Sequence, residues 1–454
     1  MASSQHNPPE VNRAWSRLLP AFARNRPDVH DGLPNIVGNI AWQIGDNLLR
    51  MGVGLLLGIW VARYLGPEQF GLLSYALAFV ALFSPLAMLG LDDIVVRNLV
   101  REPASKQAIL GTSFFLRLIG GVVSTLATIA VIAWLRPDDR QSLWLVAILA
   151  AGTLFQAFNT IELWFNAQVQ AKYPVLARNA AFLICALGKI ALILAEAPLV
   201  AFAWISLLET VLGAAGLVIA YRARGECLRE WIGRWSMAAD LLKDSWPLIF
   251  SCIIIVVYLR IDQVMLGEMA GSEAVGVYSV AVRLAEVWFF FSAAVYWSVL
   301  PAFIETRAAS EALFYERLQK YYNLMALSAY AIAIPVMLLA NWLVPLLFGA
   351  EYAEAGPMLA VLIWANLFIY LESARSAFFN AMNWYRIHAV TLALGAGLNI
   401  LLNLYLIPRY GGLGAAIASC IAYWFAAHGS CFLFRSLHRT GWMLTRAIFY
   451  PKPW

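Results

Sequence analysis

Charged residues are scarce in this chain. They make up 13% of its 454 residues, whereas 62% are hydrophobic and the mean hydropathy is +0.70. In soluble domains about a quarter of the residues are charged, so this composition excludes a soluble protein and predicts an integral membrane protein. The formal net charge of +5 comes from arginines between the apolar runs, so it does not indicate a nucleic-acid partner.

Cysteine is scarce too, and catalytic motifs are missing. The five cysteines form no close pair and no metal-ligand spacing, so the sequence predicts reduced thiols and no metal site. It contains no H-E-x-x-H, D-x-D, G-x-S-x-G or P-loop pattern. We therefore expect a protein that is not an enzyme and needs no cofactor. No short apolar core lies before Asn35, so no cleavable signal is expected either.

Apolar runs of membrane-spanning length fill most of the chain. Twelve can be placed, six within residues 36–221 and six within residues 247–434. This pattern predicts an all-α integral membrane protein of about 12 transmembrane helices in two six-helix lobes. Residues 222–246, the longest polar connection, are the predicted linker between the lobes. An even number of spans places both termini on one side of the membrane.

The basic residues outside the spans predict how the protein is oriented in the membrane. The N-terminal segment (residues 1–35) and the C-terminal tail (residues 435–454) are basic, and the connections on their side are rich in arginine and lysine. Because cytoplasmic loops are enriched in these residues, both termini are predicted to be cytoplasmic. Residues 11–24 mix apolar and basic side chains at helical spacing. They are compatible with an interfacial helix on anionic phospholipid or with an unstructured tail. The opposite side carries only Arg63, Arg136, Arg140 and Arg409.

A short motif occurs in both halves. The pattern G-x-E-x-x-G-x-x-S follows the first span at Gly66–Ser74 and the seventh span at Gly271–Ser279. In each copy the first glycine permits a tight turn, and the glutamate suits the positive end of the next helix. Turn chemistry alone could produce this match. If the repeat is real, an axis along the membrane normal relates the two halves, which is a known transporter plan.

Several stretches resemble a known family. They are the hairpin V-A-R-Y-L-G-P-E-Q-F-G-L-L-S-Y-A within Ile44–Leu91, R-I-D-Q-V-M-L-G at Arg260–Gly267 and G-G-L-G-A-A-I-A-S at Gly411–Ser419. They resemble the Wzx-type polysaccharide flippases of the MOP superfamily over residues 35–434. The resemblance implies two six-helix lobes around a central cavity, a MOP/MATE-like fold.

The same resemblance implies a function. It is transport of undecaprenyl-diphosphate-linked saccharide by alternating access, from the cytoplasmic to the periplasmic leaflet of the bacterial inner membrane. Such a flippase would serve the synthesis of O-antigen, capsule or exopolysaccharide. The implied partners are this polyprenyl-linked saccharide and the polysaccharide polymerase machinery.

Arginines inside the spans are the candidate ligands for a diphosphate. In the first span Gln43, Asp46 and Arg50 lie on one helix face, a polar stripe that must face protein or a water-filled cavity. A diphosphate that crosses the membrane needs fixed positive charge, and arginine matches phosphate geometry best. We rank Arg50 first because of its depth. The other candidates are Arg283, Arg260 and Arg117.

The same charges also have structural and coupling interpretations. Asp46 with Arg50 and Arg283 with Glu286 share helix faces, and Lys189 could meet Glu209 between the fifth and sixth spans. Such pairs would simply neutralise each other. Alternatively, a titratable carboxylate could bias two conformations and couple transport to an ion. The candidate residues of this cavity and coupling group are Asp46, Asp262, Glu286, Glu209 and Lys189.

Uncharged polar groups are the candidates for saccharide recognition. Gln156, Asn159 and Glu162 recur at helical spacing in the fourth span, and Gln43 lies on the stripe of the first. Hydrogen bonding between helices is the competing explanation.

Two other classes of protein compete with a flippase. A cation-coupled exporter of small amphiphilic molecules, as in MATE proteins, would favour a cavity rich in acids and aromatics rather than six intramembrane bases. A membrane enzyme acting on the same lipid carrier would need a sizeable periplasmic loop, whereas every periplasmic connection in this sequence is short.

Overall fold

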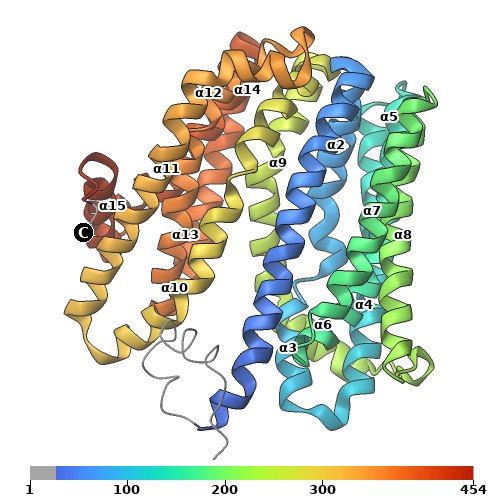
Figure 1. Cartoon of the computed structure of the whole chain (residues 1–454), viewed down its shortest axis with the longest axis vertical. Coiled ribbons are helices and arrows are strands. Elements are labelled where there is room, and N and C mark those ends of the chain that lie inside the picture. The colour runs from blue at the N-terminus through green and yellow to red at the C-terminus, as the bar shows by residue number, and fades with distance from the viewer. Residues whose placement is uncertain (1–26, 453–454) are drawn as a thin grey trace, which may run out of the picture.

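Helices make up the whole framework of the chain (Figure 1). The computed structural model describes residues 27–452, and this range contains no strand. The helices of the N-terminal lobe are α2 (Pro27–Met88), α3 (Asp92–Arg101), α4 (Lys106–Leu135), α5 (Arg140–Phe155), α6 (Thr160–Ala167), α7 (Lys172–Leu194) and α8 (Leu199–Ala223). Those of the C-terminal lobe are α9 (Trp235–Glu286), α10 (Phe289–Ala309), α11 (Glu311–Phe348), α12 (Ala355–Leu362), α13 (Ala365–Met382), α14 (Tyr385–Ala427) and α15 (His438–Phe449).

Within the described residues, ten helical stretches are long and apolar enough to cross a membrane. Two of them contain a turn, at Gly66 in α2 and at Gly411 in α14, where the backbone leaves the helical region with positive φ. Each turn divides its stretch into two segments, which accounts for the twelve predicted spans. Helix α2 starts at Pro27, before the predicted first span, whereas its membrane-crossing stretch is found from Gly45 onward. The predicted interfacial helix at residues 11–24 lies outside the described residues.

The molecule has two ends along its long axis. The turns at Gly66, Gly271 and Gly411 lie together at one of them, which we call the turn end, since a Cβ on Gly66, Gly71 or Gly412 would lie next to Glu351, Ser272 or Met358. The segments 89–106, which include α3, and 224–234 lie at the other, the linker end (Figure 1). The linker is shorter than predicted, because α9 begins at Trp235, inside the expected stretch 222–246. The first turns of α9 contain many polar residues, so the sequence predicts a loop there.

The sequence repeat is also a structural repeat. Gly66 has φ 70° and ψ 170°, and Gly271 has φ 87° and ψ 175°, a region that side chains with a Cβ rarely adopt. The second glycines of the two motifs lie face to face across the lobes. A Cβ on Gly71 would lie 1.8 Å from the carbonyl oxygen of Ser272, and one on Gly276 would lie 1.9 Å from that of Pro67. Only glycine allows this approach of two backbones.

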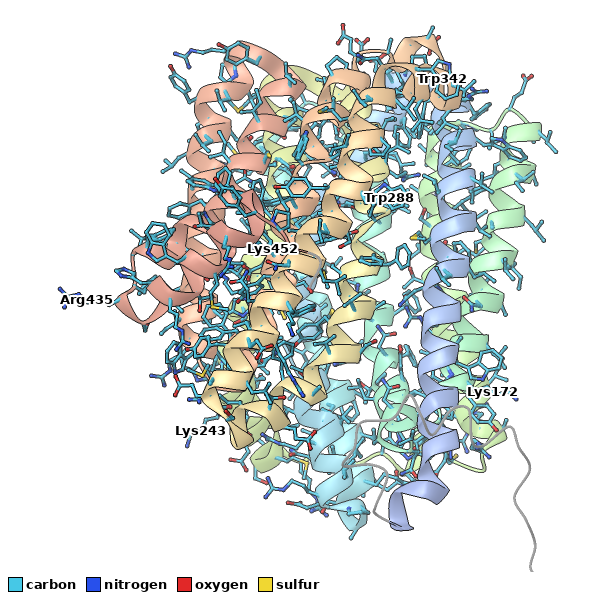
Figure 2. All side chains as sticks on the ribbon, turned by 60° about the vertical axis from the view of Figure 1, so that its left-hand side comes forward. Lys172, Lys243, Trp288, Trp342, Arg435 and Lys452 are labelled. Carbon is cyan, nitrogen blue, oxygen red and sulfur yellow. The ribbon has the colours of Figure 1, made fainter. Side chains whose placement is uncertain are left out.

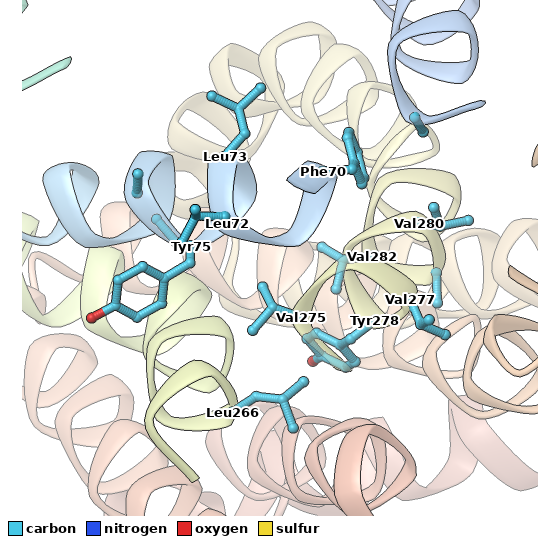
Figure 3. Packing of buried hydrophobic residues seen from close by; sticks show 14 of the residues in the cluster. Phe70, Leu72, Leu73, Tyr75, Leu266, Val275, Val277, Tyr278, Val280 and Val282 are labelled. Atoms are coloured by element: carbon cyan, nitrogen blue, oxygen red, sulfur yellow. The ribbon is translucent and has the colours of Figure 1, made fainter. Parts of the chain in front are cut away.

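Apolar side chains around these glycines join the lobes at the turn end. Phe70 and Tyr75 from α2 pack in one buried cluster with Val275 and Tyr278 from α9 (Figure 3). α2 and α9 lie next to each other at the centre of the molecule (Figure 1). The two copies of the repeat therefore form the apolar part of the contact between the lobes at the turn end.

A buried arginine holds the C-terminal lobe together. Arg375 on α13 is 0% exposed and pairs with Glu372 at 2.6 Å. Its guanidinium also donates to the Ala426 carbonyl at 2.6 Å and to the Thr391 and Ser430 hydroxyls, both at 3.1 Å. These partners come from α13, α14 and the turn after α14, so Arg375 joins three elements.

We expect Arg375→Leu to lower the free energy of unfolding by about 3–5 kcal/mol, because it removes the guanidinium partner of the buried Glu372 and leaves that carboxylate only His388, at 2.7 Å. Thermal unfolding of the purified protein in detergent measures this. Arg386→Gln, which removes an exposed arginine near the start of α14, is the control and should leave the transition unchanged. Equal transitions for both variants would contradict the structural role of Arg375.

Candidate functional site

Two polar cavities meet inside the molecule. The central cavity, about 510 Å³, lies between the lobes and is lined from α2 and α9 by Arg50, Ser74, Arg260, Gln263, Ser279, Arg283 and Glu286 among others. The second cavity, about 700 Å³, lies within the N-terminal lobe. Arg50 and Leu77 line both, so the two spaces adjoin at Arg50. Three of the four predicted diphosphate ligands thus lie around one space.

The central cavity lies deep in the membrane-spanning part. At 1.5 Å per residue, Arg50 is about 24 Å along α2 from Gly66, and Arg283 is about 18 Å along α9 from Gly271. The hydrocarbon core of a bilayer is about 30 Å thick. Both arginines therefore lie where water is scarce and a fixed charge has a strong effect.

Arg283 is the cavity arginine that lacks a partner. Within the part of the chain that the structure describes, its guanidinium has no ion pair or hydrogen bond, and its aromatic neighbour is the Phe70 ring at 5.5 Å. One of its nitrogens, Nη1, lies over Gly58, where a Cβ would be only 1.6 Å away. Arg283 thus lines the cavity with a guanidinium that no other described side chain holds.

The other two arginines have carboxylate partners. Arg260 donates to Glu286 through both terminal nitrogens, at 2.9 and 3.2 Å, which is a bidentate pair. The expected pairing of Arg283 with Glu286 is therefore wrong, because the fold brings Arg260 to that carboxylate across the turn at Gly271. Arg50 donates through Nε to Asp46 at 2.8 Å, as predicted, which leaves its two terminal nitrogens available. With Asp46 included, the cavity has one net positive charge.

Ion pairs and amides line the second cavity. Lys189 pairs with Glu209 at 3.1 Å, as predicted, and Arg178 pairs with Glu162 at 2.9 Å. The predicted saccharide ligands Gln156, Asn159 and Glu162 line the same space. Each pair keeps donors and acceptors on one wall, an arrangement that can bind a neutral polyol by hydrogen bonds.

The structure places the remaining predicted residues elsewhere. Arg117 is 1% exposed and pairs with Asp92 at 2.7 Å, so it is buried behind the wall of the second cavity and does not face the central one. The packing of α3 on α4 brings Asp92 to it. Asp262 is buried in the C-terminal lobe, where the hydroxyls of Tyr278 and Ser419 donate to it. The side chain of Gln43 lies outside the described residues.

Sequence reasoning missed Gln263 and Arg178. Gln263 lines the central cavity next to the buried Asp262, and no spacing pattern singled it out. Arg178 lies inside the predicted fifth span, so counting every intramembrane base would have found it. Ser74 and Ser279 are the last residues of the two repeat motifs, and both line the central cavity. The repeat was therefore a signal for cavity residues as well as for turns.

A polar cluster closes the cavity at the turn end. Arg136, at the end of α4, reaches across the lobes to the Gly267 carbonyl at 2.7 Å and to Glu268 at 3.0 Å. Its guanidinium lies 4.2 Å from the centre of the Tyr75 ring, and the Tyr75 hydroxyl donates to Glu268.

Further contacts between lobes support this closure. The Tyr352 hydroxyl donates to the Ala62 carbonyl at 2.7 Å, and the Arg63 guanidinium donates to the Leu346 carbonyl. Beside Arg136, burial opposes ionisation of Asp139, but hydrogen bonds from Ser142 and the charge of Arg136 outweigh it and hold the pKa of Asp139 below its ordinary value. The lobes are thus held together by a charged cluster at the turn end.

Comparison with known proteins agrees with this architecture. The fold resembles an inward-facing multidrug resistance MATE family transporter of the MOP superfamily, with TM-score 0.67, 17% identity and coverage of 88% of this chain and 94% of that chain. It resembles the lipid II flippase MurJ in an inward closed conformation equally well, with TM-score 0.67, 14% identity and coverage of 90% and 91%. These likenesses show the fold, and with the membrane-spanning helices they define the class: a multi-pass membrane protein with two helical lobes and a polar cavity between them.

The family is shown by sequence. The family model described as polysaccharide biosynthesis protein matches residues 36–307, more than half of the chain, and a second model, MatE, matches residues 247–405. The chain belongs to the polysaccharide biosynthesis protein family. A curated relative is the probable flippase AglR of Haloferax volcanii, 22% identical over 402 residues that cover 84% of this chain and 80% of the relative.

We expect Gly58→Ala to displace the Arg283 guanidinium while leaving the fold stable. The new Cβ would lie 1.6 Å from Nη1, which is the flexible end of a side chain and can move away. Alanine in place of glycine favours a helix by about 1 kcal/mol, so thermal stability should hold or rise. Ligand binding that depends on Arg283 should fall about tenfold, as for the loss of one charged hydrogen bond.

The matched control is Gly52→Ala on the same helix, where nothing lies within 4 Å of the new Cβ. Transport and thermal unfolding of both variants, measured side by side, check this prediction. Undiminished transport by Gly58→Ala would mean that the position of the Arg283 guanidinium is unimportant.

Proposed function

We propose that this protein is a flippase for a polyprenyl-diphosphate-linked saccharide, in particular an undecaprenyl-linked one, and that it works by alternating access of the two lobes. The observation that carries the proposal is the unpaired Arg283 in a cavity that also holds Arg50 and Arg260. Arginine is the side chain best suited to two neighbouring phosphates, because its planar fork donates to two oxygens at once. An unpaired arginine at this depth is costly unless an anion occupies the site for part of the cycle.

In this proposal the diphosphate contacts Arg283 and the terminal nitrogens of Arg50, while the pair Arg260–Glu286 lies beside them. The saccharide extends past Arg50 into the second cavity, where Gln156, Asn159 and Glu162 offer donors and acceptors. This division agrees with the chemistry of the two spaces, since the central one has net positive charge and the second one has paired charges. The diphosphate would thus be recognised by charge and the saccharide by hydrogen bonds.

The proposed orientation follows from the positions of the bases. Lys172 and Lys243 lie toward the linker end, whereas Trp342 lies at the turn end (Figure 2). The positive-inside rule then makes the linker end cytoplasmic, together with both termini, and the turn end periplasmic in a bacterial inner membrane. The structure, closed at the turn end, would be the state that receives substrate from the cytoplasmic leaflet. The finished unit would pass to the polymerase machinery.

Ion coupling is a separate part of the proposal. Asp46 and Glu286 each pair with a cavity arginine, and Glu209 pairs with Lys189. Asp262 differs, since its partners are neutral groups: the hydroxyls of Tyr278 and Ser419 and the backbone N–H of Gln263. A carboxylate held only by neutral groups is the one whose charge a proton or a cation would change most readily, so we assign coupling to Asp262 first.

The decisive experiment is transport in reconstituted liposomes. The purified protein is inserted into vesicles that contain a fluorescent polyprenyl-diphosphate-linked saccharide, and a membrane-impermeant reagent reports how much of it reaches the other leaflet. The proposal expects movement that depends on the protein and is faster than in vesicles with heat-unfolded protein. Equal movement in both preparations would overturn it.

A second candidate is a cation-coupled exporter of small amphiphilic molecules. It is favoured by the match of residues 247–405 to the MatE family model and by the carboxylates beside both cavities. The same vesicles, loaded with a fluorescent amphiphilic cation, test it. Export of the cation without movement of the lipid-linked saccharide would replace the flippase proposal with this one.

A further inference from the structure

Three uncharged polar side chains form the end of the central cavity that is nearest to the turn end. Ser74 lies eight residues after Gly66. Gln263 and Ser279 lie eight residues before and after Gly271. At 1.5 Å per residue, all three are about 12 Å from the turn glycines. Every other residue that lines this cavity is at least eleven residues from those glycines, so the three side chains form its end wall.

The polar groups of this end wall have no partners. Ser74 is 9% exposed and Gln263 and Ser279 are each 6% exposed, yet none of the three side chains forms a hydrogen bond within the described residues. Other buried serines of this protein donate to the carbonyl four residues earlier, as Ser113 does to Ile109 at 2.7 Å. A buried polar group without a partner costs free energy. Hydrogen bonding between helices therefore does not account for the end wall, and its groups are available to a ligand.

Apolar side chains and an arginine lie next to the end wall. Leu55, Leu77 and Val282 line the cavity about one helical turn further from the turn end. Arg283 lies four residues after Ser279, about 6 Å along α9 and on the same face of the helix. A few polar groups on mainly apolar walls are typical of a site for a small uncharged group. Such a group, bound at the end wall, would be adjacent to an anion held by Arg283.

We infer that the end wall is the subsite for the first sugar, the one joined directly to the diphosphate. This inference rests on the proposed function, because a diphosphate at Arg283 brings its first sugar next to these groups. Hydroxyl and amide groups donate and accept hydrogen bonds at once, which suits the hydroxyls of a sugar, whereas a guanidinium suits the phosphates. The later sugars extend past Leu77, which lines both cavities, into the second cavity. The end wall thus selects the first sugar.

Binding of three lipids to the full-length protein tests this inference. Native mass spectrometry from detergent compares undecaprenyl diphosphate without a sugar, the same lipid with glucose and the same lipid with N-acetylglucosamine. We expect the parent to bind at least one sugar-bearing lipid more tightly than the bare lipid. The variant Ser74→Ala/Gln263→Leu/Ser279→Ala should bind that lipid about 30-fold more weakly, since each neutral hydrogen bond contributes several-fold. Its affinity for the bare lipid should equal that of the parent.

The matched control removes the same chemical groups outside both cavities, in Gln141→Leu/Ser251→Ala/Ser298→Ala, and should keep the preference of the parent. Thermal unfolding checks that both triple variants are folded. Arg283→Ala should weaken the binding of all three lipids alike.

Two results would overturn the inference and leave the proposed function standing. In the first, the parent binds the sugar-bearing lipids no more tightly than the bare one. In the second, the end-wall variant loses all three lipids alike, which would mean that these groups bind the diphosphate. If the parent binds none of the three lipids, the proposed function itself fails, and the inference fails with it.

Discussion

Arg283→Ala is expected to slow the movement of a lipid-diphosphate-linked saccharide by about 10- to 100-fold without lowering thermal stability. The rate falls because a hydrogen bond to a charged group contributes about 1.5–3 kcal/mol, and each 1.4 kcal/mol is tenfold. Stability holds because Glu286, the carboxylate nearest in sequence to Arg283, keeps its partner Arg260. Arg283→Lys keeps the charge but loses the fork, so it should recover only part of the rate.

Arg260→Ala is the informative comparison for this prediction. Glu286 would lose its bidentate partner, and an uncompensated buried charge costs about 3–5 kcal/mol, so both transport and stability should fall. Arg140→Ala, at an exposed position of the turn end, is the control for loss of a base. Vesicle transport and thermal unfolding are measured for all variants. If Arg283→Ala transports normally, Arg283 does not hold the diphosphate.

Gly71→Val is expected to stop transport by preventing closure at the turn end. Its Cβ would lie 1.8 Å from the Ser272 carbonyl oxygen, a backbone atom that cannot move aside. The lobes must then separate there, which also breaks the contacts of Arg136 with Glu268. Because the two copies of the motif face each other, Gly276→Val should act in the same way. Each lobe keeps its own core, so we expect a shift of population rather than unfolding.

Labelling of Leu77→Cys measures this shift, because Leu77 lines both cavities. A membrane-impermeant thiol reagent should reach it from the linker side in the parent and from the turn side in Gly71→Val, with the native cysteines labelled in parallel as background. Gly397→Ala, where nothing lies within 4 Å of the new Cβ, is the control and should behave as the parent. Access from the linker side in all variants would show that closure does not depend on these glycines.

Some ion pairs of the site could be predicted from the sequence, and others could not. Asp46 with Arg50 and Lys189 with Glu209 were predicted as pairs, and both are formed. The first pair lies within one helix turn, and the second joins two helices that follow each other in the chain, so local geometry was sufficient. Arg117 was placed at the substrate, but it is buried against Asp92. The sequence predicts how deep Arg117 lies in the membrane, because depth follows from its position along the span. It does not predict which neighbouring helix the side chain faces, because that depends on how α4 packs.

The sequence by itself determined the membrane class, the twelve spans, the two halves and the glycine turns. These follow from hydrophobic thickness and from backbone conformations that only certain residues adopt, and both are properties of short segments. Only the tertiary structure decided which arginine has no partner. Glu286 had Arg283 three residues away on its own helix, yet it binds Arg260, which the turn at Gly271 brings alongside. The choice between two such partners depends on how helices pack, so it exists only once the chain has folded.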